Sequence, residues 1–124
     1  ITMKISTGID LIQIHRLQST LDRYGDRFLK RIYTPREIEI SRRKAPELAV
    51  RFAAKEAASK ALGTGIGMVS WVEMEITNDL LGKPELTLHD KALQRAQYLG
   101  LTSWSVSLSH ARETAVAVVV GYGS

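Results

Sequence analysis

Hydrophobic residues change their spacing several times along the chain, and each change marks a predicted element. In residues 4–14, regularly placed isoleucine and leucine residues predict a strand. Residues 16–24 show an amphipathic helical pattern that ends at Gly25. We interpret the next apolar segment, residues 28–33, as a short link. The chain is therefore predicted to begin with a strand, a helix and a link.

Two helices are predicted next from the signals at their ends. Residues 34–37 form a capping box with proline at the first helical position, so a helix should begin at Thr34 and end near Lys44. Pro46 cannot continue that helix and opens a long one, which Gly63 closes as a C-terminal cap. Because this second helix is rich in alanine and strongly apolar, we expect it to be largely buried.

The second half of the chain predicts mainly strands. Residues 71–77 alternate between polar and apolar, and residues 85–88 return after a turn, so the two segments predict a hairpin. Asp90 is predicted to cap a helix that Gly100 ends. Two last strands are predicted on either side of a turn, at residues 104–109 and 114–120.

These elements predict an α+β fold, with an antiparallel sheet packed against the long buried helix. A length of 124 residues, with 44% hydrophobic and 24% charged, is typical of one compact domain. We expect Met3 to be the natural first residue, preceded by two added residues, so that the domain spans residues 3–124. No signal peptide is recognised, and no apolar run approaches the ~20 residues of a membrane-spanning helix. A membrane partner is therefore not expected.

Composition narrows the kinds of site and partner. The chain has no cysteine, which excludes disulfides and thiolate metal sites and fits a reducing cytoplasm. The formal net charge is +4, and the basic excess falls in the first third of the chain, which predicts an anionic partner. This region has no helix-turn-helix, zinc-finger or aromatic-basic pattern. An acidic protein or a polyphosphate ligand therefore fits as well as nucleic acid.

The long helix carries charged residues at helical spacing. Arg51, Lys55 and Ser59 follow one another at intervals of one turn, and Glu56 and Lys60 form a similar pair offset by one residue. A carboxylate and several cations would thus be held on a stiff support facing nearby space, as in a metal and phosphate site. The alternative is ordinary pairing on a solvated helix face, worth about 0.2–0.5 kcal/mol per pair.

Other candidate motifs are weak when taken alone. The loop Gly63–Gly67 resembles a phosphate loop, but it follows a helix C-terminus and lacks the Gly-Lys-Ser/Thr ending, which favours a helix cap and flexible turn. His110, at the end of a predicted strand, is by itself more typical of a structural histidine. Asp10 lies in or beside the first strand, where aspartate is unusual.

The order of the motifs is more specific than any one of them. They are Gly8-Ile9-Asp10 with Arg16, Phe28 with Thr34 and Glu37, Arg51 to Glu56 with Lys60 and Gly63-Thr64-Gly65, Gly82-Lys83-Pro84, and Ser107 to His110. This order resembles the holo-[acyl-carrier-protein] synthases, the short single-domain branch of the phosphopantetheinyl transferases. The resemblance extends from Met3 to Val120. One departure is Ala111, where many members carry threonine.

The resemblance implies transfer of 4′-phosphopantetheine from coenzyme A to a serine of apo-acyl carrier protein, a step in fatty acid biosynthesis that requires Mg²⁺. Asp10 and Glu56 would bind the metal, since Mg²⁺ is usually held by one or two carboxylates plus substrate phosphates. Lys60 would stabilise the leaving oxygen, so Glu56 and Lys60 would be the catalytic residues. The serine proton would go to Glu56 or to a metal-bound water.

The resemblance also implies where coenzyme A would bind. Arg51 and His110 would contact its phosphates, and the Gly82–Pro84 turn would pass close to the adenosine, although a plain hairpin turn explains these three residues equally well. The full set of implied coenzyme A contacts is Arg51, Lys60, Gly63, Gly82, Lys83, Pro84, Ser109 and His110.

Partners and assembly are implied in the same way. The family is typically a cytoplasmic homotrimer with each active site at a subunit interface, and neither nucleic acid nor a membrane would be a partner. An acidic acyl carrier protein would dock on the basic first third of the chain, at Arg16, Arg27, Phe28 and Arg31. The alternative is a non-catalytic basic module that binds an acidic protein or nucleic acid, which explains the charge but not Asp10 or Glu56.

Overall fold

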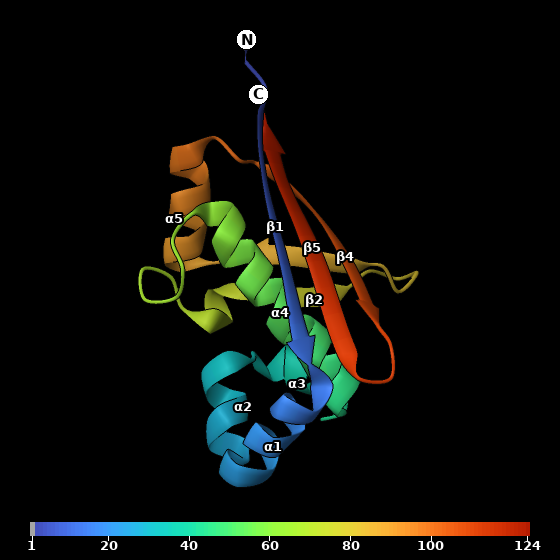
Figure 1. Ribbon diagram of the computed structural model, residues 1–124. Coiled ribbons are helices and arrows are strands. Elements are labelled where there is room, and N and C mark those ends of the chain that lie inside the picture. The colour runs from blue at the N-terminus through green and yellow to red at the C-terminus, as the bar shows by residue number, and fades with distance from the viewer. Residues whose placement is uncertain (1) are drawn as a thin grey trace.

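The computed structural model describes residues 2–124, which form two antiparallel sheets and five α-helices (Figure 1). In chain order the elements are β1 (Lys4–Gln13), α1 (Ile14–Tyr24), α2 (Asp26–Ile32), α3 (Pro35–Ser41), α4 (Ala45–Leu62), a 3-10 turn η1 (Trp71–Glu73), β2 (Met74–Asn78), β3 (Pro84–Leu88), α5 (Asp90–Leu99), β4 (Ser103–His110) and β5 (Thr114–Gly123). The predicted α+β fold with antiparallel pairing is confirmed.

The larger sheet has the order β1-β5-β4, so the last strand of the chain lies at its centre. β1 and β5 pair along their whole length, from Lys4 opposite Gly123 to Gln13 opposite Thr114. The described chain therefore begins and ends at the same end of the molecule (Figure 1). The smaller sheet is the predicted hairpin of β2 and β3. It is a separate sheet, so other contacts must hold it against the rest of the fold.

Helix α4 packs against the inner face of the larger sheet, and small residues make this close approach possible. A Cβ atom added at Gly8 of β1 would lie 1.8 Å from the carbonyl oxygen of Ala57, so no larger residue fits there. Ala53, Ala57 and Ala61 of α4 are all buried. This confirms that the alanine-rich helix is largely buried. No helix within residues 2–124 is long and apolar enough to cross a membrane.

The prediction of a short link at residues 28–33 is wrong, because residues 26–32 form helix α2. Leu29 and Ile32, three residues apart, lie on one face of this helix and are buried in the core shared with α1 and α4. Asp26 in the first turn and basic residues in the last turn complement the helix dipole. With seven residues, this helix is too short for the spacing of its apolar residues to distinguish it from a link.

Several helices and strands also begin or end at residues other than those predicted. Helix α3 ends at Ser41 because Arg42 and Arg43 adopt left-handed backbone conformations, with φ of 52° and 59°. Residues 71–73 form the turn η1 and not strand, so β2 begins only at Met74. Asp90 does not cap α5: the N-cap residue is His89, and Asp90 is the first helical residue. The Gly63 cap is confirmed, with φ of 70°.

Candidate active site

Asp10, Glu56 and Lys60 meet where the inner face of β1 lies against α4. The Lys60 ammonium donates hydrogen bonds to Asp10 Oδ1 at 3.0 Å and to the carbonyl oxygen of Ile9 at 2.8 Å. Glu56 lies one turn before Lys60 on the same helix. The charges of Asp10 and Lys60 both affect the pKa of Glu56. The structure thus brings together three of the residues predicted for the site, although Asp10 and Lys60 are 50 residues apart in the chain.

Negative charge is in excess at this cluster. Burial raises the pKa of Glu56, the nearby Asp10 carboxylate raises it further, and Lys60 opposes both only in part. Within residues 2–124, no three His, Asp or Glu side chains are grouped closely enough to hold a metal alone. Two carboxylates with a shortage of positive charge still fit Mg²⁺, because this ion usually completes its coordination with water and substrate phosphates.

A second group of predicted residues lines a cleft of about 330 Å³ between α4, the β2–β3 turn and β4. Its walls include Arg51, Gly82, Pro84, Ser109 and His110. Arg51 is only 1% exposed. Its Nε donates to the carbonyl oxygen of Ile76 at 3.3 Å, and its Nη1 donates to Glu47 Oε2 at 3.0 Å.

Three other predicted coenzyme A contacts, Lys60, Gly63 and Lys83, do not line this cleft. The Lys83 ammonium lies 3.4 Å from the carbonyl oxygen of Val106 and borders a neighbouring pocket. Gly63 lines a different cleft with Lys60. Arg51 and Lys60 are nine residues apart on α4, about two and a half turns, so they point to opposite sides of the helix. Within one copy of the chain, the cleft with Arg51 and the cluster of Asp10, Glu56 and Lys60 therefore lie on opposite sides of α4.

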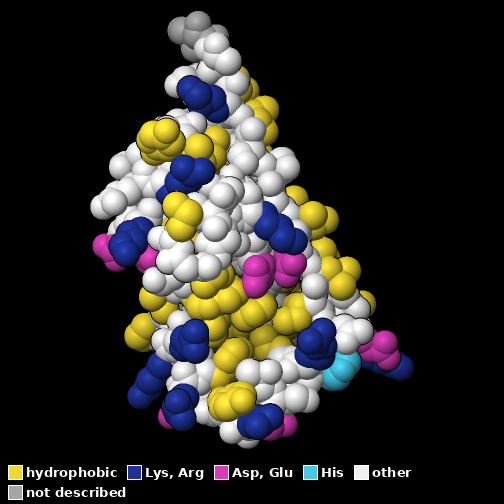
Figure 2. Space-filling model, turned by 60° about the vertical axis from the view of Figure 1, so that its left-hand side comes forward, with side chains coloured by type: hydrophobic (Ala, Val, Ile, Leu, Met, Phe, Trp, Pro, Cys, Tyr) yellow, Lys and Arg dark blue, Asp and Glu magenta, His cyan; other side chains and the backbone are white. Residues whose placement is uncertain are grey.

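The predicted docking residues line two adjoining clefts beside the acidic cluster. Arg16 and Phe28 border a cleft of about 580 Å³ that has Asp10 in its wall. Phe28 also borders the next cleft, of about 500 Å³, together with Arg27 and Arg31. Figure 2 shows a hydrophobic area with Lys and Arg side chains around it on the lower half of the molecule. The surface near Asp10 is thus apolar at its centre and basic at its edge.

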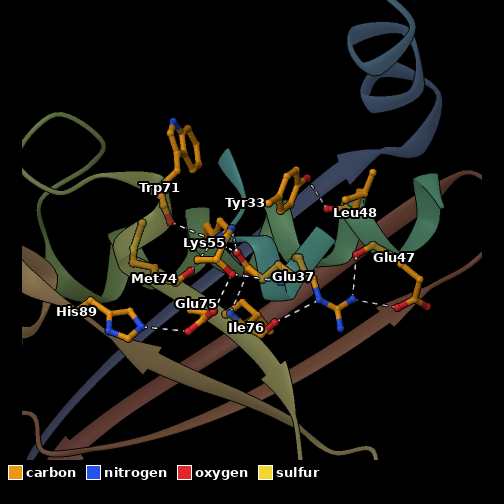
Figure 3. A network of polar contacts seen from close by, with 12 residues as sticks. Tyr33, Glu37, Glu47, Leu48, Lys55, Trp71, Met74, Glu75, Ile76 and His89 are labelled. Atoms are coloured by element: carbon orange, nitrogen blue, oxygen red, sulfur yellow. Dashed lines mark hydrogen bonds and ion pairs between the residues drawn. The ribbon is translucent and has the colours of Figure 1, made fainter. Parts of the chain in front are cut away.

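One prediction about α4 is wrong: its cations do not all lie on a face directed at nearby space. Lys55 is fully buried, and its ammonium lies 2.7 Å from Glu37 Oε1 of α3 (Figure 3). Burial lowers the pKa of Lys55, and the Glu37 carboxylate opposes this effect. Sequence reasoning missed this pair. The available signal was the position of Lys55 between the buried alanines Ala54 and Ala57, but nothing local indicated Glu37 as its partner.

The family of this chain is shown by comparison with known proteins. The model of the 4′-phosphopantetheinyl transferase superfamily matches residues 6–119, so the chain belongs to this superfamily. A holo-[acyl-carrier-protein] synthase of Herpetosiphon aurantiacus is 49% identical, with 94% of this chain and 98% of that protein covered. One of Solidesulfovibrio magneticus is 51% identical, with 91% and 94% covered.

Solved structures agree with the sequence relatives. The holo-[acyl-carrier-protein] synthase of Helicobacter pylori in complex with coenzyme A is 36% identical, with a TM-score of 0.85 over 93% of this chain and 98% of that one. The synthase of Bacillus anthracis in complex with CoA (3′,5′-ADP) is 37% identical, with a TM-score of 0.80 over 99% and 100%. The predicted family is therefore confirmed over nearly the whole chain.

Proposed function

We propose that this chain transfers 4′-phosphopantetheine from coenzyme A to a serine hydroxyl of apo-acyl carrier protein. The serine oxygen would bond to the phosphorus that carries the pantetheine. The bond from that phosphorus to the bridging oxygen would break, releasing adenosine 3′,5′-bisphosphate. The observation that carries this proposal is the Asp10, Glu56 and Lys60 cluster, in a chain whose relatives are named for this activity.

The reaction needs a group that accepts the serine proton and a positive charge beside the leaving oxygen. Glu56 and Lys60 suit these two roles. Glu56 would accept the proton of the serine hydroxyl as a general base. Lys60 carries a positive charge one turn away and would stabilise the oxygen that leaves with the nucleotide. Positioning and charge neutralisation account for most of the catalysis expected in phosphoryl transfer.

Asp10 and Glu56 would hold Mg²⁺, which when bound would neutralise and orient the pyrophosphate of coenzyme A. The repulsion between the two carboxylates supports this assignment, because a cation would relieve it. Asp10→Asn should therefore remove the Mg²⁺ dependence of coenzyme A binding, which calorimetry can measure without any turnover. Wild-type Mg²⁺ dependence in Asp10→Asn would show that the metal binds elsewhere.

We further propose a homotrimer in which each active site combines two chains. The nucleotide of coenzyme A would bind in the cleft with Arg51 and His110 of one copy, and its pyrophosphate would reach the cluster with Glu56 of another. The outer face of the larger sheet supports such an assembly, because it exposes a row of large apolar residues on β1 and β5. These residues, with the exposed fraction of each, are Ile5 (64%), Ile9 (59%), Leu11 (63%) and Tyr122 (40%).

Mixing two inactive variants tests the shared site. His110→Ala and Glu56→Gln each remove a residue from a different half of the site. If one site uses both halves from two copies, subunit exchange between the variants restores some complete sites, and activity exceeds the sum of the separate variants. Activity equal to that sum would show that each chain holds a complete site.

The carrier protein would dock on the two clefts lined by Arg16, Arg27, Phe28 and Arg31. Their apolar centre and basic edge suit an acidic protein, and Asp10 in the wall of one cleft would bring the modified serine near the catalytic cluster. In keeping with the family resemblance, we place the enzyme in the cytoplasm and its product in fatty acid biosynthesis.

Mass spectrometry of apo-acyl carrier protein, incubated with this chain, coenzyme A and Mg²⁺, tests the transfer directly. The carrier protein should gain the mass of phosphopantetheine. Glu56→Gln should lower the rate by about 10²- to 10³-fold, because it removes a charge from the site. Glu113→Gln, which neutralises an exposed carboxylate in the β4–β5 turn, is the matched control. No mass gain with the wild-type chain would contradict the proposed function.

A further inference from the structure

Strand β2 has one edge whose backbone groups are bonded by side chains and not by another strand. Its other edge pairs with β3. On this edge the Lys55 ammonium donates to the carbonyl oxygen of Met74 at 2.7 Å, and the amide of Ile76 donates to Glu37 Oε2 at 2.9 Å (Figure 3). Arg51 Nε donates to the carbonyl oxygen of Ile76 at 3.3 Å. Side chains from α3 and α4 thus take the place of a neighbouring strand.

The polar atoms of Lys55 and Glu37 are bonded to other groups of the protein, out of reach of a ligand. Besides Met74, the Lys55 ammonium donates to Glu37 Oε1 at 2.7 Å and to the carbonyl oxygen of Trp71 at 3.0 Å, so each of its three protons has an acceptor. Glu37 also accepts a hydrogen bond from the Thr34 amide. Both side chains are fully buried. These residues can orient other groups, but they cannot touch a substrate.

What they orient is the β2–β3 hairpin. The hairpin is a separate sheet, and the bonds to Met74 and Ile76 fix its base against α4. Gly82 in its turn and Pro84 at the start of β3 line the cleft, as does Arg51 of α4. A shift of β2 along α4 would therefore change the shape of the cleft and move Arg51, which is bonded to the same strand.

We propose that Lys55 and Glu37 are positioning residues for coenzyme A. By holding β2 against α4 they set the shape of the cleft that takes the adenosine 3′,5′-bisphosphate part, and they have no part in phosphoryl transfer. This inference rests on the proposed function. It differs from a general stabilising role, because loss of stability reduces the fraction of active enzyme, whereas a misplaced hairpin weakens nucleotide binding by enzyme that is folded.

Glu37→Gln is the main test, since it keeps the size of the side chain but removes its charge and one acceptor. We expect the KM for coenzyme A and the Kd for adenosine 3′,5′-bisphosphate each to rise about tenfold, with kcat within about twofold, as for a loss of uniform binding. Glu39→Gln is the matched control on the same helix, because Glu39 is exposed and its side chain is 76% accessible. It should leave all three constants unchanged.

A measurement on the wild-type chain covers the case in which Glu37→Gln does not fold. Saturation with adenosine 3′,5′-bisphosphate should slow hydrogen exchange of the Ile76 amide, which is bonded to Glu37, and of amides in the 79–83 turn. Unchanged exchange at Ile76, or a Glu37→Gln variant with lower kcat at unchanged KM, would overturn the inference. The proposed function would survive either result as long as the wild-type chain modifies the carrier protein, so the two failures are distinguishable.

Discussion

The two sides of helix α4 carry similar charged residues but hold them in opposite ways. On the side that faces α3 and β2, Lys55 is fully buried and each of its protons has an acceptor. On the side that faces β1, Lys60 is 53% exposed and lies beside the carboxylates of Asp10 and Glu56, whose negative charge it neutralises only in part. On one helix, therefore, all the hydrogen bonds of Lys55 are made within the protein, whereas the charges around Lys60 are not balanced.

This difference distinguishes charged residues that stabilise the fold from charged residues that can bind a ligand or take part in the reaction. A buried charge is tolerated only where its polar atoms all have partners, and a group satisfied in this way has nothing left to offer a ligand. A partly exposed cluster with unbalanced charge can bind a cation or a phosphate group. The charge pattern along α4 looks continuous in sequence, but the two sides should respond to mutation in different ways.

The largest expected effect on stability follows removal of Lys55. Lys55→Met should lower the free energy of unfolding by about 3–5 kcal/mol, because it leaves the Glu37 carboxylate buried without its cation. Lys60→Met should change that free energy by only about 0–1 kcal/mol, since its ion pair is exposed. Urea unfolding of both variants measures the contrast. Equal losses would show that the two sides of α4 do not differ in this way.

For activity we expect the reverse order, with the larger loss on substitution of Lys60. Lys60→Ala should lower kcat by about 10²- to 10³-fold and affect the KM for coenzyme A much less, because charge on the leaving oxygen builds up only in the transition state. Steady-state kinetics with apo-acyl carrier protein measures both constants, with Lys91→Ala on an exposed part of α5 as the control. A loss seen entirely in KM would make Lys60 a binding residue for the phosphates.

Glu73 extends the comparison to a buried carboxylate held by backbone amides. Burial alone raises its pKa, but hydrogen bonds from Ser70, Ala92 and Lys91 outweigh burial and hold the pKa below its ordinary value of 4.5. Ionised Glu73 therefore contributes stability above about pH 4.5, and this contribution is lost as the pH falls through the lower, folded-state pKa.

Glu73→Gln should consequently lower the free energy of unfolding at pH 7 by about 1.5–3 kcal/mol, the usual range for hydrogen bonds to a charged group. The gap between the variant and the wild type should shrink below about pH 4. Urea unfolding at pH 7 and at pH 3.5 provides the comparison. A gap that stays constant with pH would mean that the charge of Glu73 contributes nothing.

The smallest effect is expected at the docking surface, where charges are exposed and screened. Arg16→Glu should raise the KM for carrier protein by about fivefold to tenfold at low salt, and the difference should fade as salt approaches 0.5 M, because the Debye length shortens. Arg36→Glu makes the same charge change outside both clefts and serves as the control. Equal effects of the two variants would place the docking surface elsewhere.

The placement of Glu56 beside Lys60 could be predicted from local spacing, whereas their catalytic roles came from the family resemblance. Glu56 and Lys60 lie four residues apart on one helix, so any helix over that segment puts them on one face. The strand that carries Asp10 was also visible in the hydrophobic pattern. The meeting of Asp10 with Lys60 came from the family resemblance, since strand and helix patterns say nothing about which elements touch.

The sequence alone determined most of the elements, their end signals and the antiparallel character of the fold, because spacing, caps and turns act over a few residues. Only the tertiary structure decided that α2 is a helix, that Arg51 shares a cleft with the β2–β3 turn and His110, and that Lys55 is a buried partner of Glu37. Glu37 is 18 residues from Lys55 and looks in sequence like an ordinary helix cap. Burial and long-range partners depend on which surfaces pack together, and local patterns do not specify that packing.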